Sequence, residues 1–183
     1  MFPVDVLTLL APGQTIYAPV LDALKHQGHV TIAHHVIEGA RLPGETRVAA
    51  IARARNRAKQ LGQSHYVMFL DRDVILPPHG IEALILGLIF DPRYAAMGIN
   101  YQEPVPSGAL HVAMGAALFI RPILEQIQFR AEPDTCECYS CCEDIRRMGY
   151  RIDYLPGMRA RHLRGPLEGV GRPPGPGSPG PAP

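Results

Sequence analysis

Short apolar runs and helix-like segments alternate along the first part of the chain. Residues 4–10 and 66–70 are nearly continuous apolar runs, as is typical of parallel strands buried on both faces, and residues 30–37 form a third strand-like segment. Between them, residues 17–26 carry apolar side chains at helical spacing, and residues 46–61 are rich in alanine and arginine, which favour helices. The alternation predicts an α/β fold, a three-layer sandwich with a mainly parallel central sheet.

Later segments extend this pattern and then end it. Residues 80–90 predict a buried helix, residues 95–100 a short strand, and residues 112–120 are a further apolar run. From residue 165 to residue 183 proline and glycine dominate and almost nothing apolar is left to bury, which is typical of a disordered tail. The 183 residues therefore predict one folded domain, residues 1–164, followed by a tail.

Polar and turn-forming residues follow the predicted strands. Pro12 and Gly13 come after the first strand, Glu38 after the second, and residues 71–73 after the third. In α/β folds, ligands bind at the carboxyl ends of the parallel strands. We therefore expect the chemistry of this protein at that edge of the sheet.

Charge and hydropathy narrow the classes of function. The chain has 18 basic and 17 acidic residues, so it lacks the long-range field of a non-specific nucleic-acid or membrane binder. All but two of the basic residues are arginines, which suit local bidentate contacts with phosphate. No apolar run approaches the roughly 20 residues of a membrane span, and the first residues lack the basic start of a signal peptide. We expect a cytoplasmic protein without a transmembrane segment or a nucleic-acid partner.

The sharpest candidate site is the D-x-D pair Asp71 and Asp73, directly after the most apolar predicted strand. Both carboxylates can stand at the strand end, where a hard divalent cation can bridge them to the phosphate oxygens of a ligand. Without a cation, the two charges repel and the pKa of one carboxyl rises. The pair also fits a simple polar turn in which Asp71 caps the next segment.

The surroundings of this pair favour the functional interpretation. Residues 54–71, ARNRAKQLGQSHYVMFLD, resemble the ARN–helix–strand–D-x-D core of GT-A glycosyltransferases of the family 2 type. Residues 7–28 are similar to the opening strand, proline-containing loop and helix of that family. Residues 114–129 look like its G-G/A-x-x-x-x-R segment, which there lines the acceptor side. Residues 143–162 resemble its acidic helix, R-x-x-G-Y-x-I stretch, strand and late histidine. The resemblance covers residues 4–163.

The resemblance implies a GT-A fold and a metal-dependent hexosyltransferase. Such an enzyme moves a sugar from a nucleotide-diphosphate sugar to a hydroxyl acceptor on a glycan, lipid or protein, here with inversion. Mn²⁺ or Mg²⁺ on Asp73 would offset the charge of the leaving diphosphate. Asp71 would hold the ribose hydroxyls or a metal-bound water, and His162 could complete the metal shell, since imidazole favours Mn²⁺ over Mg²⁺. His162 is equally compatible with a surface position among arginines.

The resemblance also implies a nucleotide side to the site. The ARN element would contact the nucleotide or support the D-x-D loop, whereas its alternative is a solvated basic helix face. The end of the second predicted strand would meet the nucleobase. The residues expected on this side are Pro12, Glu38, Arg53, Arg55 and Asn56.

An inverting transferase needs a base that takes the proton of the acceptor hydroxyl. Glu143 and Asp144 are candidates, with Asp144 the first choice, although both could simply pair with neighbouring arginines on an exposed helix. In the resembled family the acidic pair stands farther ahead of the glycine in R-x-x-G-Y, here Gly149. Glu137 and Cys138 occupy that position, so Glu137 is a rival for the role of base.

The four cysteines all fall within residues 136–142, CECYSCC. A zinc site would have four thiols here but lacks two separated C-x-x-C knuckles. A redox role is less favoured, because nothing in the chain resembles a C-x-x-C motif on a thioredoxin-like βαβ unit. We expect reduced, partly buried small residues that shape the acceptor loop.

Two other classes of function are compatible with the chain. One is a non-catalytic glycosyltransferase-like domain that binds a nucleotide or a glycan. The other is a D-x-D phosphatase, which would place Thr or Val where Ile75 stands and would have a lysine after the motif, whereas Lys59 is the last lysine of this chain. The phosphatase is therefore the weaker alternative.

Overall fold

The computed structural model describes residues 1–101, 111–132 and 135–163. Its strands are β1 (Phe2–Leu10), β2 (Val30–Glu38), β3 (Tyr66–Leu70), β4 (Val74–Ile75), β5 (Tyr94–Asn100), β6 (Ala116–Ile120), β7 (Arg151–Arg159) and β8 (Arg161–His162). Its helices are α1 (Ala18–Leu24), α2 (Arg47–Ala58), α3 (Gly80–Phe90), α4 (Arg121–Leu124) and α5 (Glu137–Arg147). The predicted domain end at residue 164 and the predicted tail lie outside the described residues. Within the described part, no helix combines the length and the hydropathy needed to cross a bilayer.

The central sheet has six strands in the order β2-β1-β3-β6-β5-β7. β1 pairs in parallel with β2 and β3, and β5 pairs in parallel with β7. β6 is antiparallel to both of its neighbours, β3 and β5. The sheet is therefore mainly parallel, as predicted, and the apolar run after residue 112 supplies its one antiparallel strand among the described residues.

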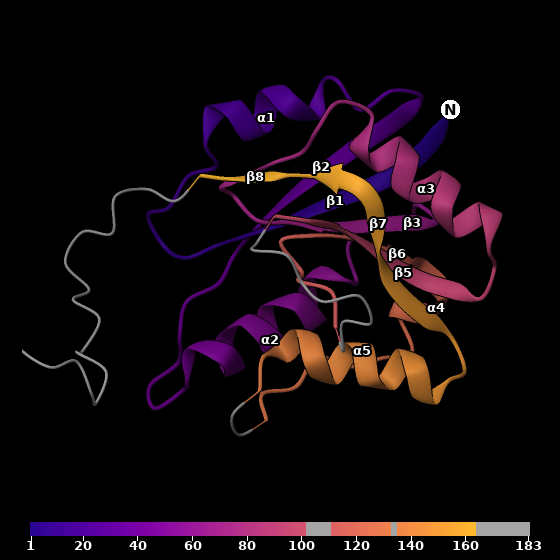
Figure 1. Ribbon diagram of the computed structural model, residues 1–183. Coiled ribbons are helices and arrows are strands. Elements are labelled where there is room, and N and C mark those ends of the chain that lie inside the picture. The colour runs from indigo at the N-terminus through magenta and orange to yellow at the C-terminus, as the bar shows by residue number, and fades with distance from the viewer. Residues whose placement is uncertain (102–110, 133–134, 164–183) are drawn as a thin grey trace, which may run out of the picture.

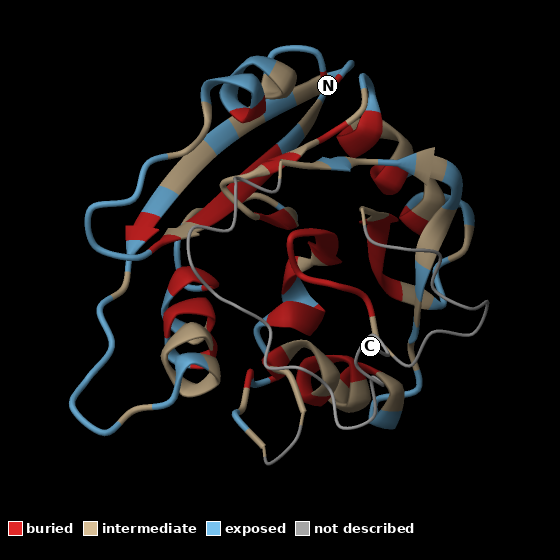
Figure 2. Ribbon diagram, turned by 60° about the vertical axis from the view of Figure 1, so that its left-hand side comes forward, coloured by how far each residue is buried: buried red, intermediate tan, exposed pale blue. Residues whose placement is uncertain are grey.

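Helices cover both faces of the sheet, which gives three layers (Figure 1). Met68 and Leu70 of β3 pack in the cluster that includes residues of α1 and α3. Val67 and Phe69 point the other way and pack with residues of α2, α4 and α5. Because both faces are covered, the strand has no polar side, which explains its continuous apolar sequence. Figure 2 shows the buried residues gathered between the helical layers.

A buried ion pair links β1 to the end of β6. Arg121 Nη2 donates to Asp5 Oδ2 at 2.6 Å, and His35 Nε2 lies 3.0 Å from Asp5 Oδ1. Burial alone would raise the pKa of Asp5, but hydrogen bonds from His35 and the Ser64 N–H, together with the charge of Arg121, lower the pKa. Arg121 also donates to backbone carbonyls, including that of Ser64. This segment resembles the acceptor-side motif of GT-A enzymes, yet its arginine holds the core together.

Asp5→Asn should therefore destabilise the fold strongly. The substitution leaves Arg121 buried without its carboxylate, and breaking such a pair costs about 3–5 kcal/mol of the free energy of unfolding. Because folding lowers the pKa of Asp5 below its unfolded value of about 3.9, its stabilisation is present above that pH and is lost as the pH falls toward the folded pKa. Urea unfolding of both proteins at neutral and acidic pH measures the difference.

The matched control for this experiment is Asp22→Asn. Asp22 pairs with Lys25 at 3.1 Å, but both side chains are exposed. An exposed pair of this kind contributes no more than about 1 kcal/mol. Equal losses of stability in the two variants would show that the Asp5–Arg121 pair does not stabilise the core.

Candidate active site

A cleft of ≈ 1090 Å³ opens at the carboxyl ends of β1, β2 and β3. Its volume slightly exceeds the range for small-molecule sites, about 300–1,000 Å³. The last residues of β1 form one part of the wall, the residues after β3 form another, and α2 and the start of α5 close it. The cleft therefore lies at the sheet edge that the sequence indicated.

Asp71 stands at the end of β3, where backbone and side chains fix its position. Its N–H donates to the Gly115 carbonyl at 3.0 Å, and the Gly115 N–H donates to Tyr101 Oη at 3.2 Å. A Cβ at Gly115 would overlap both Tyr101 Oη and Asp71 Oδ2, so any other residue there would displace these two side chains. Burial raises the pKa of Asp71, the charge of Arg55 opposes this, and nearby carboxylates including Asp73 add to the rise.

Asp73 and His162 meet through a short ribbon. β4 and β8 pair antiparallel with Val74 opposite His162, and the Leu163 N–H donates to the Asp73 carbonyl at 2.7 Å. As a result, His162 Nε2 lies 3.4 Å from Asp73 Oδ2, and both side chains are partly exposed. The His162 ring also packs edge-on against Tyr101, with centroids 5.5 Å apart. The structure thus brings together two of the three members of the predicted metal set, Asp73 and His162.

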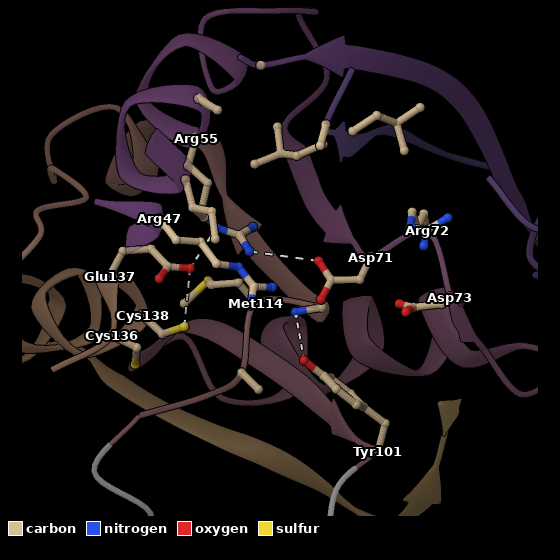
Figure 3. A pocket seen from close by; sticks show the side chains of 18 of the residues that line it. Arg47, Arg55, Asp71, Arg72, Asp73, Tyr101, Met114, Cys136, Glu137 and Cys138 are labelled. Carbon is tan, nitrogen blue, oxygen red and sulfur yellow. Dashed lines mark hydrogen bonds and ion pairs between the residues drawn. The ribbon is translucent and has the colours of Figure 1, made fainter. Parts of the chain in front are cut away.

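The third member of that set is directed elsewhere. Asp71 Oδ1 faces Arg55 Nη2 at 3.8 Å (Figure 3). Within residues 1–101, 111–132 and 135–163, no three His, Cys, Asp or Glu side chains converge as a metal-binding group. Of the predicted metal set, Asp73 and His162 therefore face each other, whereas Asp71 faces Arg55.

Arg55 is a buried cation shared by two carboxylates. Its side chain extends from α2 into the cleft, where Nε donates to Glu137 Oε1 at 3.1 Å while Nη2 faces Asp71. Its guanidinium lies over the ring of Phe69, 5.0 Å from the centroid. Arg55 thus joins the strand that carries the D-x-D motif to the helix that carries Glu137.

The cleft gathers only some of the residues that the sequence nominated. Five of them line it together and come from four different parts of the chain. They are Arg55, Asp71, Asp73, Glu137 and His162.

The other residues predicted on the nucleotide side have different surroundings. Arg53 Nη2 pairs with Glu45 Oε2 at 2.9 Å on the outer side of α2. Asn56 clamps the backbone of Phe129: its Nδ2 donates to the carbonyl at 2.7 Å, and its Oδ1 accepts from the N–H at 3.0 Å. Asn56 therefore links α2 to the segment before α5. The remaining two residues, Pro12 and Glu38, are not among those that line the cleft, whereas their neighbours Ala11 and Gly39 are.

The first-choice base is also held away from the cleft. Asp144 Oδ2 accepts from Arg130 Nη1 at 2.6 Å and its Oδ1 from Nη2 at 3.0 Å, a bidentate pair. Glu143 accepts from Arg147 at 2.8 Å, one turn along the exposed face of α5. Glu143 thus has the pairing within the helix that the sequence offered as its alternative, whereas the bidentate partner of Asp144 is Arg130, which lies outside the helix. Of the three candidates, Glu137 is the one that lines the cleft.

Several lining residues were not predicted as site residues. Arg47 and Ile51 precede Arg55 by eight and four positions on α2, so they share its helix face. The helical spacing from Arg55 could therefore have indicated Arg47 as a residue of the site. Arg72 stands inside the D-x-D motif, donates to the Thr15 carbonyl at 3.1 Å and also lines the cleft. His111 reaches the cleft from a segment with no local signal.

No protein-family model matches this sequence, and no curated protein matches it. The structure, however, is similar to the mannosyltransferase PcManGT from Pyrobaculum calidifontis, solved with GDP-Man and Mn²⁺ (TM-score 0.65, 16% identity, 90% of this chain and 58% of that chain). It is also similar to S. aureus TarS (0.64, 13%, 87% and 36%) and to TarS in complex with UDP-GlcNAc (0.59, 12%, 87% and 57%).

These similarities confirm the predicted fold. The chain has a GT-A-like glycosyltransferase fold, an α/β sandwich with a mostly parallel sheet of six strands. It spans between 36% and 58% of the lengths of those chains.

Proposed function

We propose that this protein is a metal-dependent glycosyltransferase of the hexosyltransferase type, similar to family 2. It would move a sugar from a nucleotide-diphosphate sugar to a hydroxyl acceptor with inversion. The observation that carries the proposal is the cleft at the strand ends, which the Asp73–His162 pair lines together with Arg47, Arg55 and Arg72. PcManGT and TarS, which share the fold, bind GDP-Man with Mn²⁺ and UDP-GlcNAc, respectively.

The arginines that line the cleft indicate where the nucleotide-sugar donor would bind. A diphosphate leaving group is a concentrated anion, and guanidinium groups bind phosphate oxygens through paired N–H donors. Arg47 is placed to meet such an anion on the α2 side of the cleft, and Arg72 on the D-x-D side. The first loop and Gly39 line the β1 and β2 ends, where the nucleoside would lie.

The donor set of Asp73 and His162 fits a divalent cation. Their facing oxygen and nitrogen are 3.4 Å apart and open to the cleft, and mixed carboxylate and imidazole ligands suit Mn²⁺. When bound, the cation would act as a Lewis acid that stabilises negative charge on the leaving diphosphate. Asp71, held at the end of β3 and beside Arg55, would orient the ribose hydroxyls or a water next to the cation.

Glu137 is the proposed base. It is the first residue of α5, its carboxylate lines the cleft, and Arg55 orients that carboxylate. A base must lie within hydrogen-bond reach of the acceptor hydroxyl. In this arrangement the acceptor would approach between α5 and the D-x-D loop.

The pairing of Glu137 also favours a second candidate function. Arg55 and the thiol of Cys138 both hydrogen-bond to Glu137 Oε1, and the side chain is only 8% exposed. A carboxylate held in this way could serve as a structural partner of Arg55. The chain would then be a nucleotide- or glycan-binding domain without turnover.

A thermal-shift screen with UDP, GDP, CDP and dTDP, each with and without Mn²⁺, tests the proposed donor site. We expect the melting temperature to rise with at least one nucleotide, and to rise further with Mn²⁺, because a ligand that binds only the folded state stabilises it. Hydrolysis of the corresponding nucleotide sugar would then separate the transferase from the binding domain. No shift with any nucleotide, together with activity on a phosphomonoester, would support the phosphatase instead.

A further inference from the structure

The two edge strands of the central sheet differ in how well they are protected from pairing with another chain. β7 forms one edge. It carries the exposed residues Arg151 and Arg159, it contains Pro156, and its register with β5 shifts twice. Charged side chains, proline and bulges are features by which edge strands avoid adding a further strand. β7 is therefore a protected edge.

β2 forms the other edge and has none of these features. Its nine residues, VTIAHHVIE, include no lysine, arginine or proline, and they pair with β1 in an unbroken register. The single acidic residue, Glu38, is the last one. In the part of the chain that the structure describes, no strand pairs with the outer side of β2. β2 is therefore a long, regular edge that remains open to a further strand.

The hydrogen bonds to β1 show which backbone groups of β2 point outward. The His29 carbonyl accepts from the Phe2 N–H at 2.9 Å, and the Gly39 N–H donates to the Leu10 carbonyl at 2.9 Å. Because successive residues of a strand direct their N–H and C=O groups to alternate sides, the odd-numbered residues face β1. None of the outward groups bonds to another described residue. The outward residues are Val30, Ile32, His34, Val36 and Glu38.

The side chains of β2 fit a second copy of the same strand. Val36 is 50% exposed although it is a large apolar residue. Ile32, four positions earlier, lies on the same face of the strand and is only partly buried. When a second β2 runs antiparallel with His34 opposite His34, Val36 lies opposite Ile32 of that copy, and outward residues face outward residues. Apolar β-branched pairs of this kind stabilise neighbouring strands.

The charges of β2 favour an antiparallel copy over a parallel one. Antiparallel pairing places the two Glu38 side chains at opposite ends of the interface, roughly 27 Å apart at about 3.4 Å per residue. Parallel pairing would place both at the same end, where they repel. Burial lowers the pKa of His34, and the charge of His35 adds to this, so the two His34 rings at the centre are uncharged at neutral pH.

We propose that β2 is a dimer interface, along which two copies of this chain pair antiparallel over residues 30–38 and join their sheets into one. A two-fold axis at His34 relates the copies, so each contact occurs twice. The five outward residues of each strand exchange about ten backbone hydrogen bonds in all, two for each facing pair. The two clefts then open in opposite directions, because the strands of the two copies run in opposite directions. The interface does not depend on the proposed transferase activity.

The molar mass of the full chain in solution tests this proposal. Light scattering coupled to size-exclusion chromatography measures the mass over about a hundredfold range of concentration, because association follows mass action. At the upper concentrations we expect about twice the 20.0 kDa of one chain. A mass of 20.0 kDa at every concentration would overturn the proposal, so the unaltered protein alone can decide against it.

Val36→Pro separates this edge from every other surface. Proline is tolerated in an edge strand where the replaced N–H points away from the sheet, so the bonds to β1 should persist while each copy loses an outward donor. We expect a folded monomer by circular dichroism and light scattering. The matched control Val36→Thr keeps the N–H and the branched shape and should remain dimeric. A dimer that persists in Val36→Pro would overturn the proposal.

Cysteine cross-linking tests the register, also where Val36→Pro does not fold. In the double variant Ile32→Cys/Val36→Cys, position 32 of one copy faces position 36 of the other with Cα atoms about 5.5 Å apart. This separation suits a disulfide, which spans about 4.4–6.8 Å. Within one chain the two positions are roughly 13 Å apart, so the bond must join two copies. Mild oxidation should give a covalent dimer with positions 32 and 36 linked in its peptide map, and a map without that link would overturn the proposal.

Discussion

Asp73→Ala is expected to abolish Mn²⁺-dependent nucleotide binding while the protein stays folded. Asp73 is partly exposed, and its carboxylate faces His162 across 3.4 Å, so its removal opens no cavity in the core. Loss of residues that merely support a metal ligand costs about 10–100-fold in metal affinity, so loss of a ligand should cost at least about 100-fold. Titration calorimetry with the nucleotide found in the thermal-shift screen, with and without Mn²⁺, measures the change.

The matched control is Asp22→Ala, which removes an exposed carboxylate on α1 that pairs with Lys25. It should bind the nucleotide as the unaltered chain does, with the same gain from Mn²⁺. If Asp73→Ala binds with unchanged affinity and unchanged dependence on Mn²⁺, the assignment of the metal site to Asp73 is wrong.

Glu137→Gln should lower sugar transfer by about 10²–10⁴-fold, the usual contribution of general base catalysis. The amide keeps the size of the side chain and can still contact Arg55, but it cannot take a proton. Because the loss falls on the chemical step, kcat should drop while donor binding changes little. Initial rates of transfer and of donor hydrolysis, measured with donor at saturation, test this expectation.

Asp144→Asn is the matched control for Glu137→Gln. Asp144 is paired with Arg130 and is directed away from the cleft, so transfer should be retained. A loss of transfer in Asp144→Asn but not in Glu137→Gln would return the role of base to Asp144. If the unaltered chain shows neither hydrolysis nor transfer, it acts as a binding domain; if both occur and neither variant lowers them, the base is another residue.

The elements with strong local signals could be predicted closely from the sequence. The expected helix over residues 80–90 has the same bounds as α3, and the expected strand over 66–70 has the same bounds as β3. Thr46 was expected to open a helix, and it is the N-cap of α2, accepting from the Ala49 N–H at 3.1 Å. These outcomes depend on contacts within a few residues, which periodicity and capping describe well.

The site depended on contacts that local patterns do not contain. Glu137 and Arg55 are 82 positions apart and meet because α2 and α5 pack on the same face of the sheet. The spacing of Asp144 gave no sign that Arg130 would hold it. Asn56 lies in a motif that implied nucleotide binding, yet its amide binds the backbone of Phe129. In each case a partner distant in sequence decides what the side chain does.

Contacts at both ends of the antiparallel strand β6 fix the number of residues between them. Just before it, Gly115 must approach Asp71 without a Cβ, and just after it, Arg121 must reach the carboxylate of Asp5. Between these anchors, each residue of β6 pairs with a defined residue of β3. One added or deleted residue would slip this register and turn every side chain to the opposite face. Variation in chain length should therefore be excluded from residues 115–121 and accumulate in exposed loops such as residues 40–45.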